Sequence, residues 1–116
     1  MPSLRVIAEE VSPETWSLFV TGDLDGEAIF ALHWEVLRVL DAGASIILLD
    51  LHEAAFVDST GIRELVEAST RMRSRGGRVA VIAPSGRVRR SLELSRVDDL
   101  VPVFSTRADA LAAIAS

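Results

Sequence analysis

Residues 45–51 read Ser-Ile-Ile-Leu-Leu-Asp-Leu, an almost continuous apolar run. A strand with one face in water alternates apolar and polar side chains, whereas a strand that is buried on both faces is apolar nearly throughout. The run therefore predicts a strand in the middle of a sheet, covered by helices. Residues 78–83, Arg-Val-Ala-Val-Ile-Ala, predict a second strand of the same buried kind.

Helical patterns lie on either side of residues 45–51. Apolar residues recur at helical spacing over residues 27–40, and Gly43 is a suitable stop. The apolar side of this helix consists of Ile29, Leu32, Val36 and Leu40, with Phe30, Trp34 and Leu37 nearby. A second helix is expected from near Ser59 to a stop at Gly76-Gly77.

The rest of the chain predicts shorter elements. Two β-prone runs, at residues 4–8 and 16–20, are joined by a hairpin connection at residues 12–14. Pro84-Ser85-Gly86 opens a third helix, which runs from Ser85 to Leu94. Its apolar side is Val88, Leu92 and Leu94. Residues 100–104 predict a last strand, and Thr106 with Asp109 resembles a capping box for a helix over residues 107–115.

The order of the predicted elements is β-β-α-β-α-β-α-β-α. Strands that alternate with helices of this length form a parallel or mixed sheet with helices packed on it. We therefore predict an α/β fold with a single domain over residues 1–116, built from a mixed β-sheet of about five strands and about four helices.

The composition excludes several kinds of chemical site. The 116 residues include no cysteine, so disulfides, thiolate metal sites and thiol catalysis are ruled out. Lysine is also absent, which rules out Schiff-base chemistry. His33 and His52 are the only histidines, on a helix and in a loop with no constellation of carboxylates around them, and we expect neither to be catalytic. We expect no metal and no cofactor. Trp16 and Trp34 are expected to be packing residues, in the core or partly exposed.

Charge is distributed unevenly along the chain. Residues 1–70 hold 13 acidic residues against three arginines, and residues 71–116 hold nine arginines against four acidic residues, with a formal net charge of −5 overall. Nucleic-acid affinity comes largely from the neutralisation of phosphates, so we expect no direct nucleic-acid partner. Residues 1–5 lack the basic region and apolar core of a signal peptide, and no run reaches the roughly 18 apolar residues of a membrane span. We therefore expect a cytoplasmic location and no membrane partner.

The segment Phe56-Val57-Asp58-Ser59-Thr60-Gly61-Ile62 lies between the exit loop of a buried strand and the start of a helix. A helix N-terminus exposes unpaired N–H groups and the positive end of the helix dipole, so it tolerates an anion such as a covalent phosphate. Asp58 or Ser59 as a simple helix cap is the alternative reading. Ser59 is not a hydrolase nucleophile of the Gly-x-Ser-x-Gly type, because Val57 stands where the first glycine would be.

Several motifs occur in a fixed order along the chain. They are Thr21-Gly22-Asp23-Leu24-Asp25, Leu49-Asp50-Leu51, the Phe56 to Gly61 segment, Gly76-Gly77 and the helix from Ser85 to Leu94. In this order and at these spacings the chain resembles the STAS domain family of bacterial anti-sigma factor antagonists, over essentially its whole length. Each motif is weak by itself, and the ordered set is specific.

The resemblance implies a function that is not enzymatic. A member of this family binds, in its unphosphorylated state, an anti-sigma factor with serine kinase activity and so frees a sigma factor. Phosphorylation of the serine after the motif aspartate, here Ser59, switches binding off, and a serine phosphatase restores it. Thr60 is an alternative acceptor. The resemblance implies partner-binding residues at Asp23, Asp25, Asp58, Ser59, Thr60, Gly61, Ile62 and Arg63.

One position departs from the family pattern. Many members have glycine or a small residue soon after the motif glycine, whereas here Ile62 is followed by Arg63 and Glu64. Arg63 adds bulk and charge in the first helical turn, where the partner is expected. The second reading of the whole chain is a STAS-type accessory domain of a lipid or solute transport system, since such domains carry a similar motif.

The arginines between Arg71 and Arg90 fit two readings. Arg71, Arg73, Arg75 and Arg78 surround a helix end, where positive charge offsets the dipole. Arg87, Arg89 and Arg90 begin the next helix, where that reason does not apply. These residues form either a solvated face with surface ion pairs or a contact patch for an acidic partner surface or a phosphate group.

Overall fold

The computed structural model describes residues 4–84 and 86–115. A five-stranded sheet has the order β1 (Arg5–Ser12), β2 (Thr15–Leu24), β3 (Ile46–Val57), β4 (Arg78–Ile82) and β5 (Val103–Phe104). β1 is antiparallel to β2, and every other neighbouring pair is parallel. The helices are α1 (Ile29–Asp41), α2 (Ser59–Arg73), α3 (Arg87–Leu94) and α4 (Arg107–Ala115), with short 3-10 turns η1 (Gly26–Ala28) and η2 (Val97–Asp99). This architecture confirms the predicted fold class.

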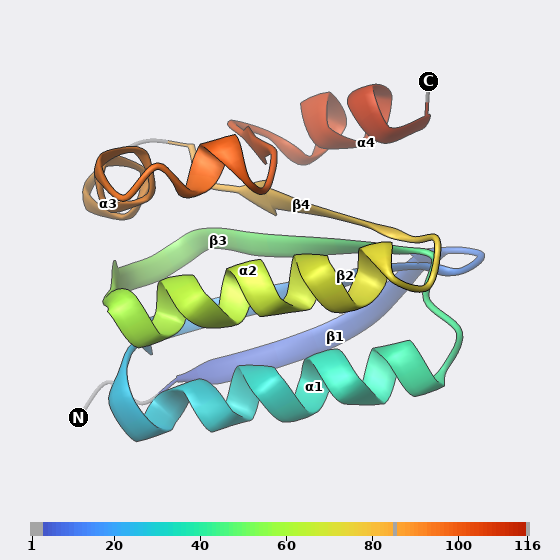
Figure 1. Cartoon of the computed structure of the whole chain (residues 1–116), viewed down its shortest axis with the longest axis horizontal. Helices are drawn as coiled ribbons and strands as arrows, with labels where there is room; N and C mark the ends of the chain where they lie inside the picture. The colour runs from blue at the N-terminus through green and yellow to red at the C-terminus, as the bar shows by residue number, and fades with distance from the viewer. Residues whose placement is uncertain (1–3, 85, 116) are drawn as a thin grey trace.

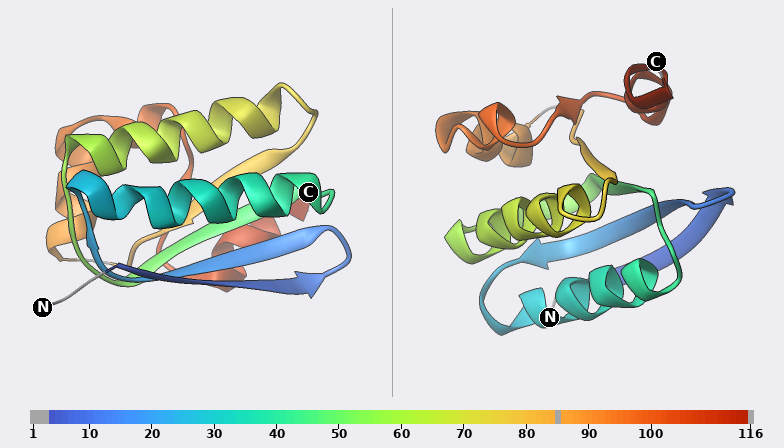
Figure 2. Two further views of the ribbon diagram at one scale, coloured as in Figure 1. Left: turned by 90° about the horizontal axis from the view of Figure 1, so that it is seen from below. Right: turned by 45° about the vertical axis from the view of Figure 1, so that its right-hand side comes forward.

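β3 is the central strand that the apolar run predicted. Ile47, Leu48 and Leu49 are fully buried, and they alternate between two separate clusters of core residues. Ile47 and Leu49 belong to the larger cluster with α1, α2 and α3, whereas Leu48 belongs to a smaller one beneath α4. Figures 1 and 2 show α1 and α2 side by side on one face of the sheet, with α4 on the other.

β2 and β3 are longer than the sequence predicted. The predicted strand ends at Val20, but Asp23 lies near the end of β2, where it pairs with Phe56. Phe56 and Val57 likewise belong to β3, not to an exit loop, and His52 lies in the same strand. The two strands are longer because their parallel pairing continues to Leu24 and Val57, across two irregularities in the register. The sequence pattern does not reveal these irregularities.

Other elements differ at their ends or faces. α3 begins at Arg87, and Ser85, where the helix was expected to begin, lies outside the described residues. Leu94 was expected on the apolar side of α3, but it is 78% exposed because it is the last residue of a short helix. Phe30 and Trp34 are also exposed, at 59% and 65%, so Trp34 is not a core residue. Thr106 does cap α4, since its Oγ1 accepts the Asp109 N–H at 3.0 Å.

The parallel strands all end at the same side of the sheet. β3 leads into α2 and β4 leads into α3, and α1 also begins at this end, on the left in Figure 1. The Asp58 to Gly61 segment therefore lies where the carboxyl ends of parallel strands meet helix N-termini, a usual place for functional sites in α/β folds.

Candidate functional site

Asp58 is the N-cap of α2. Its backbone is extended, and its Oδ1 accepts hydrogen bonds from the N–H groups of Thr60 and Gly61 at 2.9 and 3.0 Å. The same oxygen accepts a hydrogen bond from Thr60 Oγ1 at 2.5 Å. Together with backbone hydrogen bonds from Gly61, Gly26 and Thr60, this contact holds the pKa of Asp58 below its usual value. The Asp58 carboxylate is therefore charged at neutral pH.

Ser59 and Thr60 differ in what their hydroxyl groups do. Both residues are exposed at the start of α2. Thr60 Oγ1 is engaged by Asp58, whereas within residues 4–84 and 86–115 the Ser59 hydroxyl has no hydrogen-bond partner. Ser59 therefore presents a free hydroxyl to solvent, and Thr60 would first have to give up its contact with the cap.

Gly61 fixes the helix against the sheet. It is buried, and a Cβ at this position would collide with the backbone oxygen of Leu24 and lie 2.7 Å from Val57 Cγ2. The Asp58 N–H also donates to the Leu24 backbone oxygen at 3.3 Å. The first turn of α2 is thus joined to the ends of both β2 and β3. Gly61, which the resemblance placed among the partner-binding residues, has no exposed surface of consequence and serves to position its neighbours.

Asp23 and Asp25 lie on the chain that passes this helix start. Asp23 pairs in the sheet with Phe56, three residues before Ser59, and Asp25 precedes η1 in an extended conformation. Both are half-buried, and in the described part of the chain neither carboxylate has a hydrogen-bond or ion-pair partner. With Asp58 they make this end of the sheet acidic.

Ile62 and Arg63 extend the site along α2. Ile62 is half-buried and packs against the larger core cluster, so only part of it is accessible. Arg63 is exposed, and its guanidinium has no partner among the described residues. It follows Ser59 by four residues and therefore lies one turn further along the same side of the helix.

Each histidine lies beside one carboxylate, although no larger group of carboxylates surrounds either in the described residues. His33 Nδ1 lies 3.2 Å from Glu64 Oε1, which joins α1 to α2, and His52 Nδ1 lies 2.6 Å from Asp50 Oδ1. The His33–Glu64 contact spans 31 residues, so no local pattern could reveal it. His52 and Asp50 are two residues apart in β3, and the two-residue period of a strand would have placed them on one face once the strand was known to reach Val57.

The sequence pattern of the STAS domain family matches residues 7–110. The chain belongs to the STAS domain family. A Thermotoga neapolitana protein, named as a candidate anti-sigma factor antagonist, is 31% identical to this STAS domain over 78 residues, which are 67% of the chain and 69% of the relative. The resemblance stated from the sequence motifs is thereby confirmed.

Solved structures similar to this STAS domain include an anti-sigma factor antagonist from Mycobacterium paratuberculosis, with a TM-score of 0.88 at 24% identity over 98% of the chain and 96% of that structure. The anti-sigma factor antagonist SpoIIAA in its unphosphorylated form gives 0.78 at 21% identity over 96% of each chain. A Bacillus SpoIIAA in its phosphorylated form gives 0.71 at 21% identity over 95% of the chain and 99% of that structure. A sulfate transporter family protein from Wolinella succinogenes gives 0.72 at 19% identity over 92% and 89%. At these identities the likeness shows the fold.

The described residues lack two other features. No group of three or more histidine, aspartate or glutamate side chains in residues 4–84 and 86–115 is arranged to hold a metal ion. Over the same part of the chain no helix has the length and apolar character needed to cross a membrane.

Proposed function

We propose that this STAS domain is an anti-sigma factor antagonist whose binding is switched by phosphorylation of Ser59. In its unphosphorylated state it binds an anti-sigma factor with serine kinase activity, and the sigma factor held by that kinase is released. A serine phosphatase returns the modified protein to the binding state. The partner surface consists of the accessible parts of Asp23, Asp25, Asp58, Ser59, Thr60, Ile62 and Arg63, positioned by Gly61.

The observation that carries the proposal is the free, exposed hydroxyl of Ser59 at a rigid helix start. A kinase must reach the acceptor oxygen from solvent, and Ser59 satisfies this without any local rearrangement. Thr60 satisfies it less well, because Thr60 Oγ1 already donates to Asp58. We therefore assign the acceptor to Ser59 in preference to Thr60.

The covalent step is a phosphoryl transfer. Ser59 Oγ attacks the γ-phosphorus of ATP, the bond to the β,γ-bridging oxygen breaks, ADP leaves and the hydroxyl proton passes to solvent or to a base of the kinase. The phosphatase reverses the modification with water, which releases inorganic phosphate and restores the hydroxyl. The N–H groups at the start of α2 partly stabilise the new phosphate.

The added charge explains how binding would be lost. A phosphoserine carries about −1.5 to −2 charges at pH 7, and here it would directly follow the ionised Asp58, at the end of the sheet that also carries Asp23 and Asp25. A partner surface that fits the bare hydroxyl then meets extra bulk and a more negative site. A penalty of about 1.4 kcal/mol lowers affinity tenfold, so a modest mismatch is enough.

The comparisons support the partner class. The similar Thermotoga neapolitana protein is named as a candidate anti-sigma factor antagonist, and SpoIIAA, which has the same fold, has been solved in both unphosphorylated and phosphorylated forms. The transport reading rests on likeness in fold to the sulfate transporter family protein, which is only 19% identical. No feature of the Ser59 site favours that reading specifically.

The test uses the anti-sigma factor serine kinases of the same organism as binding partners. Ser59→Ala is expected to bind its partner as the wild type does, and Ser59→Asp to bind about tenfold more weakly or worse. Ser74→Asp, at the exposed far end of α2, is the matched control and should keep wild-type affinity. Wild-type affinity for both Ser59 variants would refute the switch, and binding to a transporter subunit in place of any kinase would favour the transport reading.

A further inference from the structure

A hollow lined by arginines lies on the surface between the end of β4, the first turns of α3 and the segment that precedes α4. Its volume is about 770 Å³, and its lining includes Arg87, Arg89, Arg90, Glu93 and Ser105. It shares no residue with the site around Ser59. Its arginines begin α3, at the helix end where the dipole does not favour positive charge.

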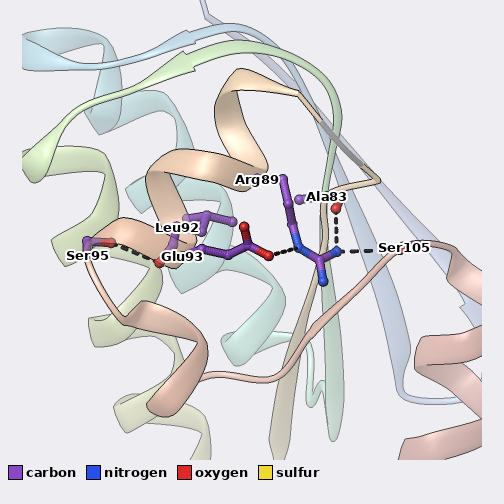
Figure 3. Close-up of polar contacts among 6 residues, drawn as sticks. All are labelled: Ala83, Arg89, Leu92, Glu93, Ser95 and Ser105. Carbon is purple, nitrogen blue, oxygen red and sulfur yellow. Dashed lines mark hydrogen bonds and ion pairs between the residues drawn. The ribbon is translucent and has the colours of Figure 1, made fainter.

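Arg89 is held in place by its neighbours. Its Nη1 donates to the Ala83 backbone oxygen at 2.8 Å and approaches Ser105 Oγ at 3.5 Å, while its Nε donates to Glu93 Oε2 at 3.3 Å. Figure 3 shows Glu93 on one side of the guanidinium and Ala83 and Ser105 on the other, with the remaining nitrogen, Nη2, pointing away from all three. Arg89 therefore presents free N–H donors in a fixed orientation, so a ligand that it binds need not immobilise this side chain.

Arg87 and Arg90 differ from Arg89 in being unpaired. Both are exposed, and neither guanidinium has a hydrogen-bond or ion-pair partner in residues 4–84 and 86–115. Glu93, the acidic residue of the lining, is already engaged by Arg89. The charged side chains of the hollow are thus three arginines against one glutamate, which leaves an excess of positive charge on an otherwise acidic protein.

We propose that this hollow binds the phosphate group of a small phosphate monoester or of inorganic phosphate. Arginine donors in a fixed fork match the oxygens of a phosphate, and the charge of a dianion balances the excess carried by Arg87, Arg89 and Arg90. Aromatic side chains are absent from the described lining, so nothing there would stack on a base. Recognition is therefore confined to the phosphate group and is the same for a free phosphate and for an esterified one.

The test is a titration of the isotope-labelled protein with inorganic phosphate, followed by amide chemical shifts. Sodium chloride of matched ionic strength is the reference, at about pH 7.5, where the phosphate is mostly a dianion. Wild type is expected to show saturable shifts at residues 86–90 and at Ser105 that chloride does not reproduce. Glycerol 3-phosphate, O-phosphoserine and ADP are titrated in parallel to identify the source of the phosphate group.

Three variants separate a specific site from general attraction. Arg87→Gln/Arg90→Gln is expected to weaken phosphate affinity roughly tenfold, since it removes two charge-assisted contacts without disturbing any contact within the protein. Glu93→Gln is expected to strengthen it several-fold, because the competing carboxylate charge is gone. Arg5→Gln/Arg73→Gln, which removes two exposed and unpaired arginines outside both the hollow and the Ser59 site, is the matched control and should bind as wild type.

Two sets of results would overturn the proposal. One is that the amide chemical-shift changes follow ionic strength alone. The same holds if they are as large in Arg87→Gln/Arg90→Gln as in the control variant. The other is binding of ADP without binding of inorganic phosphate or glycerol 3-phosphate, because a site that reads only phosphate binds all of them. Since these variants leave Ser59 untouched, failure here is independent of the proposed switch.

Discussion

Gly61 is the residue at which the Asp-Ser-Thr-Gly segment lies closest to the core. Gly61→Ala would place a Cβ against the Leu24 backbone oxygen and 2.7 Å from Val57 Cγ2. Backbone cannot yield as a flexible side chain does, so we expect a loss of about 1–3 kcal/mol in the free energy of unfolding, despite the better helix propensity of alanine. Urea unfolding checks this. Ser59→Ala, at an exposed position two residues earlier, is the control and should be about as stable as wild type. If Gly61→Ala were also as stable as wild type, the close approach of Gly61 to Leu24 and Val57 would be wrong.

Asp58 stabilises α2 through its cap, and its contribution depends on pH. Asp58→Ala is expected to lower the free energy of unfolding by about 0.5–2 kcal/mol. Because the folded state holds the pKa of Asp58 below its unfolded value, the stabilisation is present above the unfolded pKa and is lost as pH falls through the folded one.

Asp58→Asn keeps a capping oxygen without the charge. We therefore expect the advantage of wild type over Asp58→Asn to shrink as the pH falls below about 4, as measured by urea unfolding over a pH series. An advantage that grows as the pH is lowered would contradict the assignment of the charged cap.

The sequence alone predicts that residues 58–61 form a functional site, but it does not show the separate role of each residue. The motif pointed to Ser59 and left Thr60 open, because two adjacent hydroxyl groups look alike in a sequence. Only the geometry shows Thr60 Oγ1 engaged by Asp58 and Gly61 pressed against Leu24. Those contacts join segments far apart in the chain, which is why no local pattern carries them.

At the scale of elements, α1 and α2 are joined by the contact between His33 and Glu64. Glu64 is only 6% exposed, and burial raises its pKa more than the hydrogen bond and charge of His33 lower it. When the pKa of a carboxyl group is higher in the folded than in the unfolded state, the group contributes to the stability of the fold at pH values below the unfolded pKa. That contribution is lost as the pH rises through the folded pKa.

Glu64→Gln removes this titration while keeping a hydrogen-bonding side chain. The stability of wild type relative to Glu64→Gln is therefore expected to fall as the pH rises from about 4.5 to about 7, measured by urea unfolding. Glu9→Gln, exposed on β1 and not among the charges that shift the pKa of Glu64, is the control and should show no such trend. If the stability of wild type relative to Glu64→Gln instead increased with pH, the His33–Glu64 ion pair would outweigh burial in setting the pKa of Glu64.

Strand lengths were the weakest part of the sequence prediction. The apolar run at residues 45–51 located β3 correctly, because full burial leaves a clear signal. Its second half mixes exposed and buried residues, so only the pairing of β2 with β3 shows that it continues to Val57. His52 was consequently expected in a loop, and Asp23 lies beyond the end of the predicted strand. Leu94 was assigned by spacing to the apolar side of its helix, but spacing does not show that the short α3 ends at this residue and leaves its side chain exposed.

At the scale of the whole molecule, the account requires that phosphorylation change the surface without refolding the domain. Ser59 is exposed and its hydroxyl makes no contact within the described residues that a phosphate would break. We expect the phosphorylated protein to keep its far-ultraviolet circular dichroism, with amide chemical-shift changes confined to the start of α2 and the end of β2. Changes spread through α4, on the opposite face of the sheet, would contradict a local charge switch.

The identity of the phosphorylated residue tests the central claim most directly. Wild type, Ser59→Ala and Thr60→Val are each incubated with ATP and the anti-sigma factor serine kinases of the same organism, and intact mass with peptide mapping then locates any modification. The account predicts one phosphoryl group on wild type and on Thr60→Val, carried by Ser59 in both, and none on Ser59→Ala. A wild type that no kinase modifies, or a Ser59→Ala variant that gains a phosphoryl group as readily as wild type, would contradict it.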